Sequence, residues 1–203
     1  MKKNKFSKNW VIKQKRDLYV KQSKIQGYRS RAVYKLQEIN EKFNILKNGI
    51  SLVDLGSAPG SWSQFVSRNF KNSKIVSIDL KEMEKIESIY QIKGDFTDEI
   101  QQKKIIDYFG GKIDTVISDM AVNTTGNKNL DSIVTGELCL EALRFAKDQL
   151  KPNGAFVSKI FMGSTFSEIV GEAKLNFKET NIYKPPSSRK ESKESFIICK
   201  KLR

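Results

Sequence analysis

Short apolar runs alternate with amphipathic segments along most of this chain. Strand-like runs are predicted at 51–56, 74–80, 90–93, 115–119 and 155–161. Helix-like patterns lie between them, at 62–69, 98–109, 133–150 and 164–177. Such alternation predicts an α/β fold in which a mostly parallel sheet carries helices on both faces.

The two ends of this pattern differ from its middle. Two strand-like runs, 178–184 and 195–200, are joined by a polar turn that contains proline, so we expect a hairpin whose last strand runs antiparallel to the others. Near the start, Ser30 is predicted to cap a helix whose apolar positions recur at helical spacing: Ala32, Leu36, Ile39 and Phe43. Lys35 lies beside this apolar stripe and should point along the protein body.

Charge is distributed unevenly. The formal net charge is +14, and residues 1–35 hold twelve of the 37 Lys and Arg residues but only one acid, Asp17. Excess positive charge in one arm indicates a polyanionic partner, and the lack of a long apolar stripe favours nucleic acid over a membrane surface. We therefore expect a basic RNA-binding arm at 1–28 and a folded domain at 29–203. A merely solvated, lysine-rich tail is the alternative.

Several chemistries are excluded by composition. The chain has no histidine, which rules out Ser-His-Asp hydrolysis and H-E-x-x-H metal sites. Cys139 and Cys199 stand alone and are predicted to be reduced core residues. No apolar run has transmembrane length and no signal-type segment is visible, so we expect a cytoplasmic protein without a membrane partner. An organellar transit peptide is a minor alternative for the basic start.

The segment 54–62 reads Asp-Leu-Gly-Ser-Ala-Pro-Gly-Ser-Trp and joins a strand-like run to a helix-like one. Gly56 and Gly60 allow a tight turn and a close approach of a ligand to the backbone. The spacing G-x-x-x-G differs from the dinucleotide motif G-x-G-x-x-G, and no G-K-[ST] follows to hold phosphates. The loop therefore suits a nucleotide-type cofactor without a pyrophosphate, with S-adenosylmethionine as the obvious candidate. An ordinary glycine turn is the alternative.

Acidic residues lie at or just after the ends of three predicted strands, where ligands of open α/β sheets bind. Asp79 lies nineteen residues after Gly60, a spacing at which an acid meets a ribose diol. Asp95 is placed to accept a hydrogen bond from an adenine amino group, and Asp119 ends the fourth strand. Trp62 is placed either over the cofactor or in the core. Each carboxylate could instead simply cap the next helix.

Lys159 is unusual because it shares a strand face with apolar residues: Ala155, Val157 and Phe161. An unpaired buried ammonium there would be costly. Either the side chain extends to solvent from an edge strand, or a carboxylate such as Asp119 pairs with it. Because the last strand should run antiparallel, Glu194 would lie at the same sheet edge. Lys35, Asp119, Lys159 and Glu194 could therefore converge.

Taken together, these segments resemble the FtsJ/RrmJ family of ribosomal RNA 2′-O-methyltransferases. The resemblance runs in order from about Asp17 to the carboxyl terminus, on the segments D-L-Y-V-K-Q-S, G-Y-R-S-R-A-V-Y-K-L-Q-E-I, D-L-G-S-A-P-G-S-W-S-Q, G-D-F, S-D-M-A-V-N, F-V-S-K-I-F and S-S-R-K-E-S-K-E-S. It implies a Rossmann-like methyltransferase fold with a seven-stranded sheet and S-adenosylmethionine as cofactor. It also implies methylation of a uridine ribose in large-subunit (23S) ribosomal RNA. We expect no metal, because the leaving sulfur departs neutral, and we expect a monomer that acts late in ribosome assembly.

The resemblance also implies roles for individual residues. The catalytic Lys-Asp-Lys-Glu tetrad of the family falls on Lys35, Asp119, Lys159 and Glu194. Cofactor contacts fall on Gly60, Trp62, Asp79, Asp95 and Asp119. Lys159 is then the candidate either to take the proton of the ribose hydroxyl or to orient its oxygen.

Two positions depart from the family pattern. Ser61 stands where a second glycine is common, and Val122 stands where proline is common. Ser61 should be tolerated if its φ is negative, and Val122 still permits an extended turn. Methyltransferases of tRNA and of the mRNA cap share the same tetrad, so both remain alternative functions. A non-catalytic RNA-binding assembly factor is a third, although it would be expected to have lost tetrad or cofactor-loop residues.

Overall fold

A seven-stranded sheet forms the centre of the molecule. The computed structural model describes residues 17–121 and 128–203. The strands are β1 (Ser51–Leu55), β2 (Lys74–Asp79), β3 (Ile89–Lys93), β4 (Ile113–Ser118), β5 (Leu150–Phe161), β6 (Phe177–Tyr183) and β7 (Glu194–Leu202). The helices are α2 (Leu18–Ile25), α3 (Val33–Phe43), α4 (Ser61–Asn69), α5 (Glu99–Phe109), α6 (Lys128–Gln149) and α7 (Phe166–Asn176).

The strand order is β3-β2-β1-β4-β5-β7-β6. Strands β1 to β5 run parallel to one another, and β7 runs antiparallel to both β5 and β6. The predicted α/β fold, with its mostly parallel sheet and antiparallel last strand, is therefore confirmed. The order also places the first strand, β1, next to β4, so the carboxyl ends of β1, β2 and β4 lie side by side.

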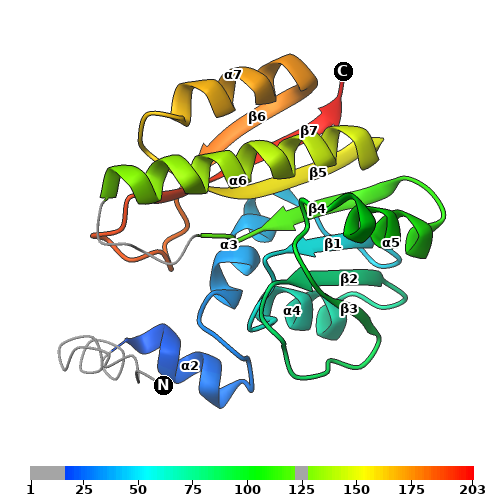
Figure 1. Cartoon of the computed structure of the whole chain (residues 1–203). Helices are drawn as coiled ribbons and strands as arrows, with labels where there is room; N and C mark the ends of the chain where they lie inside the picture. The colour runs from blue at the N-terminus through cyan, green and yellow to red at the C-terminus, as the bar shows by residue number, and fades with distance from the viewer. Residues whose placement is uncertain (1–16, 122–127) are drawn as a thin grey trace, which may run out of the picture.

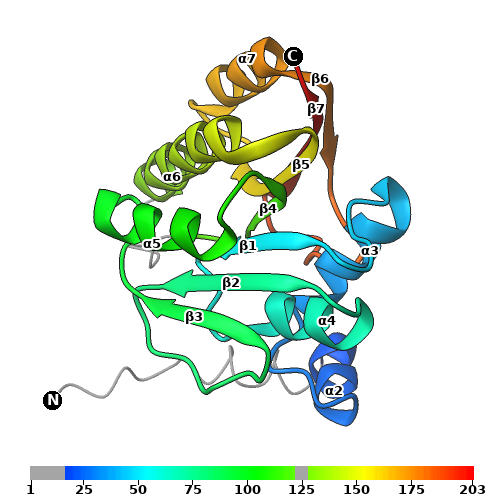
Figure 2. The same ribbon diagram turned by 90° about the vertical axis from the view of Figure 1, so that its right-hand side faces the viewer.

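Helices cover both faces of the sheet (Figures 1 and 2). Helices α5, α6 and α7 lie on one face, and α3 and α4 lie on the other. Strand side chains alternate between the two cores, as the two-residue period of a strand requires. In β1, for example, Val53 and Leu55 pack under the first set of helices, whereas Leu52 packs under the second. Both cores are apolar along the middle strands, which explains the short continuous apolar runs in the sequence.

Helix α2 lies within the expected basic arm and was not predicted. Asp17 caps it, because the Asp17 carboxylate accepts hydrogen bonds from the backbone N–H groups of Tyr19 (3.1 Å) and Val20 (3.4 Å). The Tyr19 ring packs 5.3 Å from that of Tyr34 on α3, and Asp17 forms an ion pair with Arg31. The end of the arm thus packs against the domain, while residues 1–16 lie outside the described part. The boundary at residue 28 stays a prediction.

Three predicted element boundaries need correction. Ser30 does not cap α3, which begins at Val33; its hydroxyl accepts from the N–H of Ala32 (3.2 Å) and donates to Ser61 Oγ (2.8 Å). Helix α6 begins earlier than position 133. Strand β5 begins at Leu150 because Leu150 already pairs with Ile113, ahead of an irregularity in the β4–β5 register.

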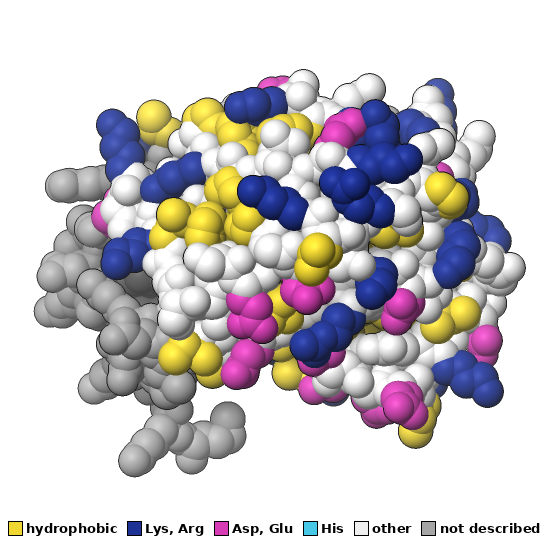
Figure 3. All heavy atoms as spheres, turned by 90° about the horizontal axis from the view of Figure 1, so that it is seen from above, with side chains coloured by type: hydrophobic (Ala, Val, Ile, Leu, Met, Phe, Trp, Pro, Cys, Tyr) yellow, Lys and Arg dark blue, Asp and Glu magenta, His cyan; other side chains and the backbone are white. Residues whose placement is uncertain are grey.

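One face of the molecule carries both basic and acidic side chains. Figure 3 shows this on the face seen from above Figure 1, where Lys and Arg side chains are spread among Asp and Glu side chains. Across residues 17–121 and 128–203, no helix is both long enough and apolar enough to pass through a membrane.

Candidate active site and cofactor pocket

Sheet register brings together three of the four tetrad residues. Ser118 at the end of β4 pairs with Ser158 on β5, so Asp119 follows β4 beside Lys159. On the other side of β5, the antiparallel register pairs Phe161 with Glu194 at the start of β7. Asp119, Lys159 and Glu194 therefore meet at one edge of the sheet. Lys35 reaches the same place from α3, which packs on the face of the sheet opposite α5, α6 and α7.

The four side chains form a chain of ion pairs. Lys159 Nζ lies 2.6 Å from Asp119 Oδ1 and also donates to the Asp119 backbone carbonyl at 2.9 Å. Lys35 Nζ lies 3.7 Å from Asp119 Oδ2 and 3.1 Å from Glu194 Oε1. The structure thus brings together Lys35, Asp119, Lys159 and Glu194 in the order Lys159–Asp119–Lys35–Glu194.

The Asp119 carboxylate is the electrostatic centre of this cluster. Burial would raise its pKa, but the positive charges of Lys159 and Lys35 and their hydrogen bonds hold that pKa below its usual value. Its side chain is 18% exposed and that of Lys159 is 9% exposed. Asp119 is therefore a carboxylate at neutral pH, and each lysine that flanks it has a counter-ion.

The edge-strand interpretation of Lys159 is wrong. Strand β5 lies between β4 and β7 inside the sheet, and Lys159 is only 8% exposed. Its ammonium cannot extend to solvent, so it is paired with Asp119. A buried amine of this kind occurs in proteins mostly where it has a partner.

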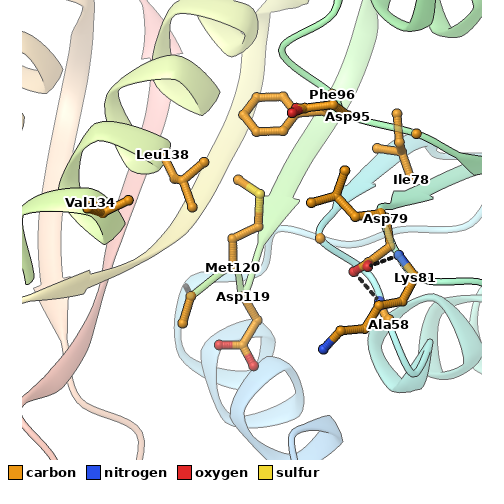
Figure 4. A pocket seen from close by; sticks show the side chains of 14 residues that line it. Ala58, Ile78, Asp79, Lys81, Asp95, Phe96, Asp119, Met120, Val134 and Leu138 are labelled. Atoms are coloured by element: carbon orange, nitrogen blue, oxygen red, sulfur yellow. Dashed lines mark hydrogen bonds between the residues drawn. The ribbon is translucent and has the colours of Figure 1, made fainter. Parts of the chain in front are cut away.

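A cavity of about 470 Å³ opens beside the tetrad at the carboxyl ends of β1, β2, β3 and β4. Figure 4 shows it, with Phe96 on one side, Met120 in the middle and the Asp119 carboxylate pointing away from Phe96. Its lining combines carboxylates with apolar side chains from both sides: Gly56, Ala58, Ile78, Asp79, Leu80, Lys81, Gly94, Asp95, Phe96, Asp119, Met120, Ala121, Val134 and Leu138. The site thus has the mixed lining that small-molecule pockets commonly have.

All three predicted cofactor acids, Asp79, Asp95 and Asp119, line this cavity. Asp79 also holds the loop at its rim, because it accepts from the N–H of Ala58 (2.9 Å) and of Lys81 (2.8 Å). Asp95 accepts at one oxygen from the N–H and the hydroxyl of Thr97 (3.0 and 2.8 Å). Carboxylate oxygens can each accept more than one hydrogen bond, so both acids can also take a ligand hydroxyl or amine.

Gly60 and Trp62 do not line the cavity. Gly60 has φ of 98°, and a Cβ there would come within 3.1 Å of the Arg29 guanidinium. The Trp62 side chain is 2% exposed, donates to the Ala32 carbonyl at 2.7 Å and packs 5.8 Å from the Phe196 ring. Of the two placements considered, the Trp62 side chain adopts the one in the core. Cofactor contacts by either residue stay a prediction.

Sequence reasoning missed two residues at the cofactor loop. Asp54 is 1% exposed in β1, and its carboxylate accepts from the N–H (3.1 Å) and hydroxyl (2.6 Å) of Ser63. Arg29 donates to the carbonyls of Pro59 (3.0 Å), Glu84 (2.9 Å) and Lys85 (3.1 Å). Asp54 could have been found from the sequence, because it is an acid within an apolar strand. No periodic pattern in the sequence indicates the role of Arg29.

Of the two departures from the family pattern, one is described by the structure. Ser61 is the first residue of α4, it is 3% exposed, and it is not among the described residues that have positive φ. A Cβ is therefore accommodated there, as expected. Val122 lies outside the described residues.

The sequence pattern of FtsJ-like methyltransferases matches residues 28–202. The chain belongs to the FtsJ-like methyltransferase family. The protein named Ribosomal RNA large subunit methyltransferase E of Pelagibacter ubique (strain HTCC1062) is 63% identical over 203 residues, which is 100% of both chains. The protein of the same name in Rickettsia akari (strain Hartford) is 45% identical over 199 residues, 95% of this chain and 88% of that one.

Solved structures agree with this membership. A Plasmodium falciparum protein, described as a ribosomal RNA methyltransferase, is 31% identical with a TM-score of 0.76 and covers 86% of this chain and 98% of its own. Human methyltransferase-like protein 13, solved with S-adenosylhomocysteine, shares the fold at 15% identity and a TM-score of 0.59, over 82% of this chain and 81% of its own.

As an FtsJ-like methyltransferase, this chain uses S-adenosylmethionine. The residues present fit that cofactor. Asp79 and Asp95 supply acceptors for hydroxyl and amino groups, while Ile78, Phe96 and Leu138 supply apolar walls for a purine ring. Gly56 leaves the space that Met120 fills at the cavity floor, since a Cβ at position 56 would come within 2.0 Å of the Met120 side chain.

Proposed function

We propose that this methyltransferase methylates a ribose 2′-hydroxyl of large-subunit ribosomal RNA. The convergence of two lysines and two acids beside the cofactor cavity carries the proposal, and the names of the relatives support the choice of RNA. The proposed target is a uridine, methylated late in assembly of the large subunit by a cytoplasmic monomer. The proposed residue roles are those of the tetrad, with Asp79, Asp95 and Asp119 at the cofactor.

When bound, S-adenosylmethionine supplies an electrophilic methyl group on a positively charged sulfur. In the transfer, a bond would form between the 2′-oxygen and the methyl carbon, the carbon–sulfur bond would break with its electron pair left on sulfur, and the hydroxyl proton would pass to solvent water. Holding the oxygen in line with the reacting bond supplies most of the acceleration. Asp119 lines the cavity and pairs with Lys159, so it joins the cofactor side to the ribose side.

Lys159 is proposed to orient the 2′-oxygen. The ionised Asp119 carboxylate pairs with a Lys159 ammonium at 2.6 Å. An ammonium has three N–H donors, and two of them can be used by the carboxylate and carbonyl of Asp119. The third can donate to a ribose oxygen, and the hydroxyl proton then leaves late, as the carbon–oxygen bond forms. Lys35 and Glu194 hold Asp119 from the other side.

The test compares Lys159→Ala with the wild-type protein. We expect methyl transfer to RNA to fall by about 100-fold or more, because a reacting oxygen misplaced by about 1 Å can cost that much. The dissociation constant for S-adenosylmethionine should stay within about threefold, since Lys159 does not line the cavity. Lys151→Ala is the matched control: Lys151 is on the same strand and pairs with Asp114 at 2.9 Å, away from the tetrad. Turnover of Lys159→Ala near that of Lys151→Ala would contradict the assignment.

A second experiment identifies the substrate. The protein is incubated with labelled S-adenosylmethionine and separate pools of naked large-subunit RNA, assembled large subunits and tRNA, and 2′-O-methylation is then mapped. We expect label on a uridine of large-subunit RNA, with assembled subunits as the better substrate. Labelling of tRNA instead would replace the proposed substrate without changing the reaction.

A further inference from the structure

A second cavity lies on the other side of the tetrad. Its volume is about 310 Å³, and its lining comes from the start of α3 and from the β6–β7 connection: Ser30, Arg31, Ala32, Lys35, Arg189, Ser192 and Glu194. It has no lining residue in common with the cofactor cavity. Lys35 connects the two, because it pairs with Glu194 in this cavity and with Asp119 in the other.

The lining of this cavity is cationic. Three of its residues are basic, and Glu194 is its one acid. Arg31 and Arg189 share a single carboxylate: Arg31 forms an ion pair with Asp17, and Arg189 Nε lies 3.8 Å from the same Asp17 oxygen. Among the residues that line the cavity, three basic side chains therefore face one acid, so the lining itself is net positive.

The charges of the two arginines act on each other. Burial and the nearby charge of Arg189 lower the pKa of Arg31, against the charges of Glu194, Glu191 and Glu38. Arg31 is 15% exposed and is also held by a hydrogen bond to the Ser187 carbonyl, whereas Arg189 is 40% exposed. Arg31 is therefore a fixed charge in the wall, and Arg189 is the donor that a ligand can reach.

The loop that carries Arg189 is held by its own hydrogen bonds and by α3. Glu38 on α3 accepts from the Ser187 N–H (2.9 Å) and hydroxyl (2.7 Å). Ser188 N–H donates to Pro185 (2.9 Å), and Ser192 N–H donates to Arg189 (3.0 Å). Lys184 Nζ donates to the Ser192 carbonyl at 2.6 Å. A guanidinium on a loop fixed in this way loses little conformational entropy when it binds an anion.

We propose that this second cavity binds the phosphodiester group next to the target ribose, with Arg189 as the phosphate donor and Arg31 as supporting charge. The inference rests on the proposed function. A phosphate is the anion that guanidinium groups recognise best in nucleic acids, through paired N–H donors. The 3′-phosphate and the 2′-hydroxyl are attached to adjacent ribose carbons, so a phosphate in this cavity places the hydroxyl at the tetrad. Arg189 thus fixes the register of the RNA.

The test uses the full-length protein and the RNA pool that wild type methylates. In Arg189→Gln we expect the KM for RNA to rise about tenfold and kcat to fall, because a phosphate beside the target positions the reacting oxygen. The slope of log kcat/KM against log salt should become shallower by the contribution of about one phosphate contact. Arg189→Lys should retain part of the activity, and the dissociation constant for S-adenosylmethionine should not change.

Lys190→Gln is the matched control. Lys190 is the next residue of the same loop, it is exposed, and it does not line the cavity. Equal effects of Arg189→Gln and Lys190→Gln would overturn the proposal, and so would a rise in KM alone, which indicates a phosphate contact remote from the target. A wild-type protein that methylates only tRNA would overturn the proposed substrate, whereas these kinetics on that tRNA would still decide the role of Arg189.

Discussion

At the scale of single residues, Asp54 is an unusual group next to the cofactor loop. It lies in the interior strand β1, and its carboxylate accepts from Ser63, whose hydroxyl also lies 2.5 Å from that of Ser77. Burial raises the pKa of Asp54 to about 7, helped by the charges of Asp119 and Asp79 and opposed by the hydrogen bonds from Ser63. Asp54 therefore keeps its proton in the folded protein at mildly acidic pH, where the unfolded chain has lost it.

This difference predicts a dependence of stability on pH. Between the ordinary value of 3.8 and about 7, the folded state holds a proton that the unfolded state has released, so the free energy of unfolding falls as pH rises. The Asp54 contribution is about 1.4 kcal/mol per pH unit within that window. Asp54→Asn removes this pH dependence, so the variant should gain stability relative to wild type as pH rises. Urea unfolding measured at several pH values between about 4 and about 7 tests this.

Asp114→Asn is the control for that series. Burial would raise the pKa of Asp114, but Lys151, the Ser51 N–H and Lys47 hold it below its ordinary value. Its contribution is therefore lost only in more acidic solution, and the Asp114→Asn difference should be flat over the same window. A wild-type minus Asp54→Asn difference that is also flat would show that Asp54 is ionised in the folded state.

At the scale of elements, Arg29 connects the basic arm to both loops at the cofactor cavity. The residue lies between α2 and α3, and its guanidinium donates to Pro59 in the loop after β1 and to Glu84 and Lys85 in the loop after β2. Ala58 and Lys81, from the same two loops, line the cavity. Arg29 thus acts as a positioning residue for the cofactor loops.

Arg29→Gln should weaken S-adenosylmethionine binding about tenfold, because the variant loses the guanidinium that donates hydrogen bonds to both loops. Each hydrogen bond to a charged group is worth roughly 1.5 kcal/mol or more. Titration calorimetry measures the effect. Arg68→Gln is the control, since Arg68 donates to Gln26 and Gly27 (both 3.1 Å) in the same connection but to neither cofactor loop. Equal losses in the two variants would mean that the α2–α3 connection, and not the loops, determines the affinity.

The helices and strands also show how much of the fold and of the site can be predicted from the sequence. Apolar periodicity and turn residues were enough for the sheet, its antiparallel last strand and the convergence of Lys159 with Asp119 and Glu194. Periodicity says nothing of long-range contacts made by a side chain to loop carbonyls, so Arg29 was missed. Helix α2 was missed because its charges conceal a weak apolar pattern, although Asp17 offered a capping signal. Trp62 satisfied its N–H in the core, which its position on α4 could not reveal.

At the scale of the whole molecule, positive charge is concentrated at the start of the chain. Residues 1–16 contain seven of the Lys and Arg residues and no acid. The face in Figure 3, by contrast, mixes both signs of charge. Neighbouring acids reduce the attraction of a lysine for phosphate, whereas residues 1–16, which hold no acid, attract RNA with their full charge. The arm is therefore predicted to supply much of the salt-dependent affinity, and the Arg31–Arg189 cavity is predicted to fix the position of the target.

Replacing those seven residues of the arm by Gln in the full-length chain tests this division. Each neutralised phosphate in a single strand contributes about 0.7 to the slope of log affinity against log salt, so the slope should become shallower by at most about 5. RNA affinity should fall while S-adenosylmethionine affinity stays constant, because Arg29 and the cofactor cavity are unchanged. The control replaces Lys103 and Lys104, exposed on α5, and should change the slope by less than about one. An arm variant with the wild-type salt slope would mean that RNA is bound by the folded domain alone.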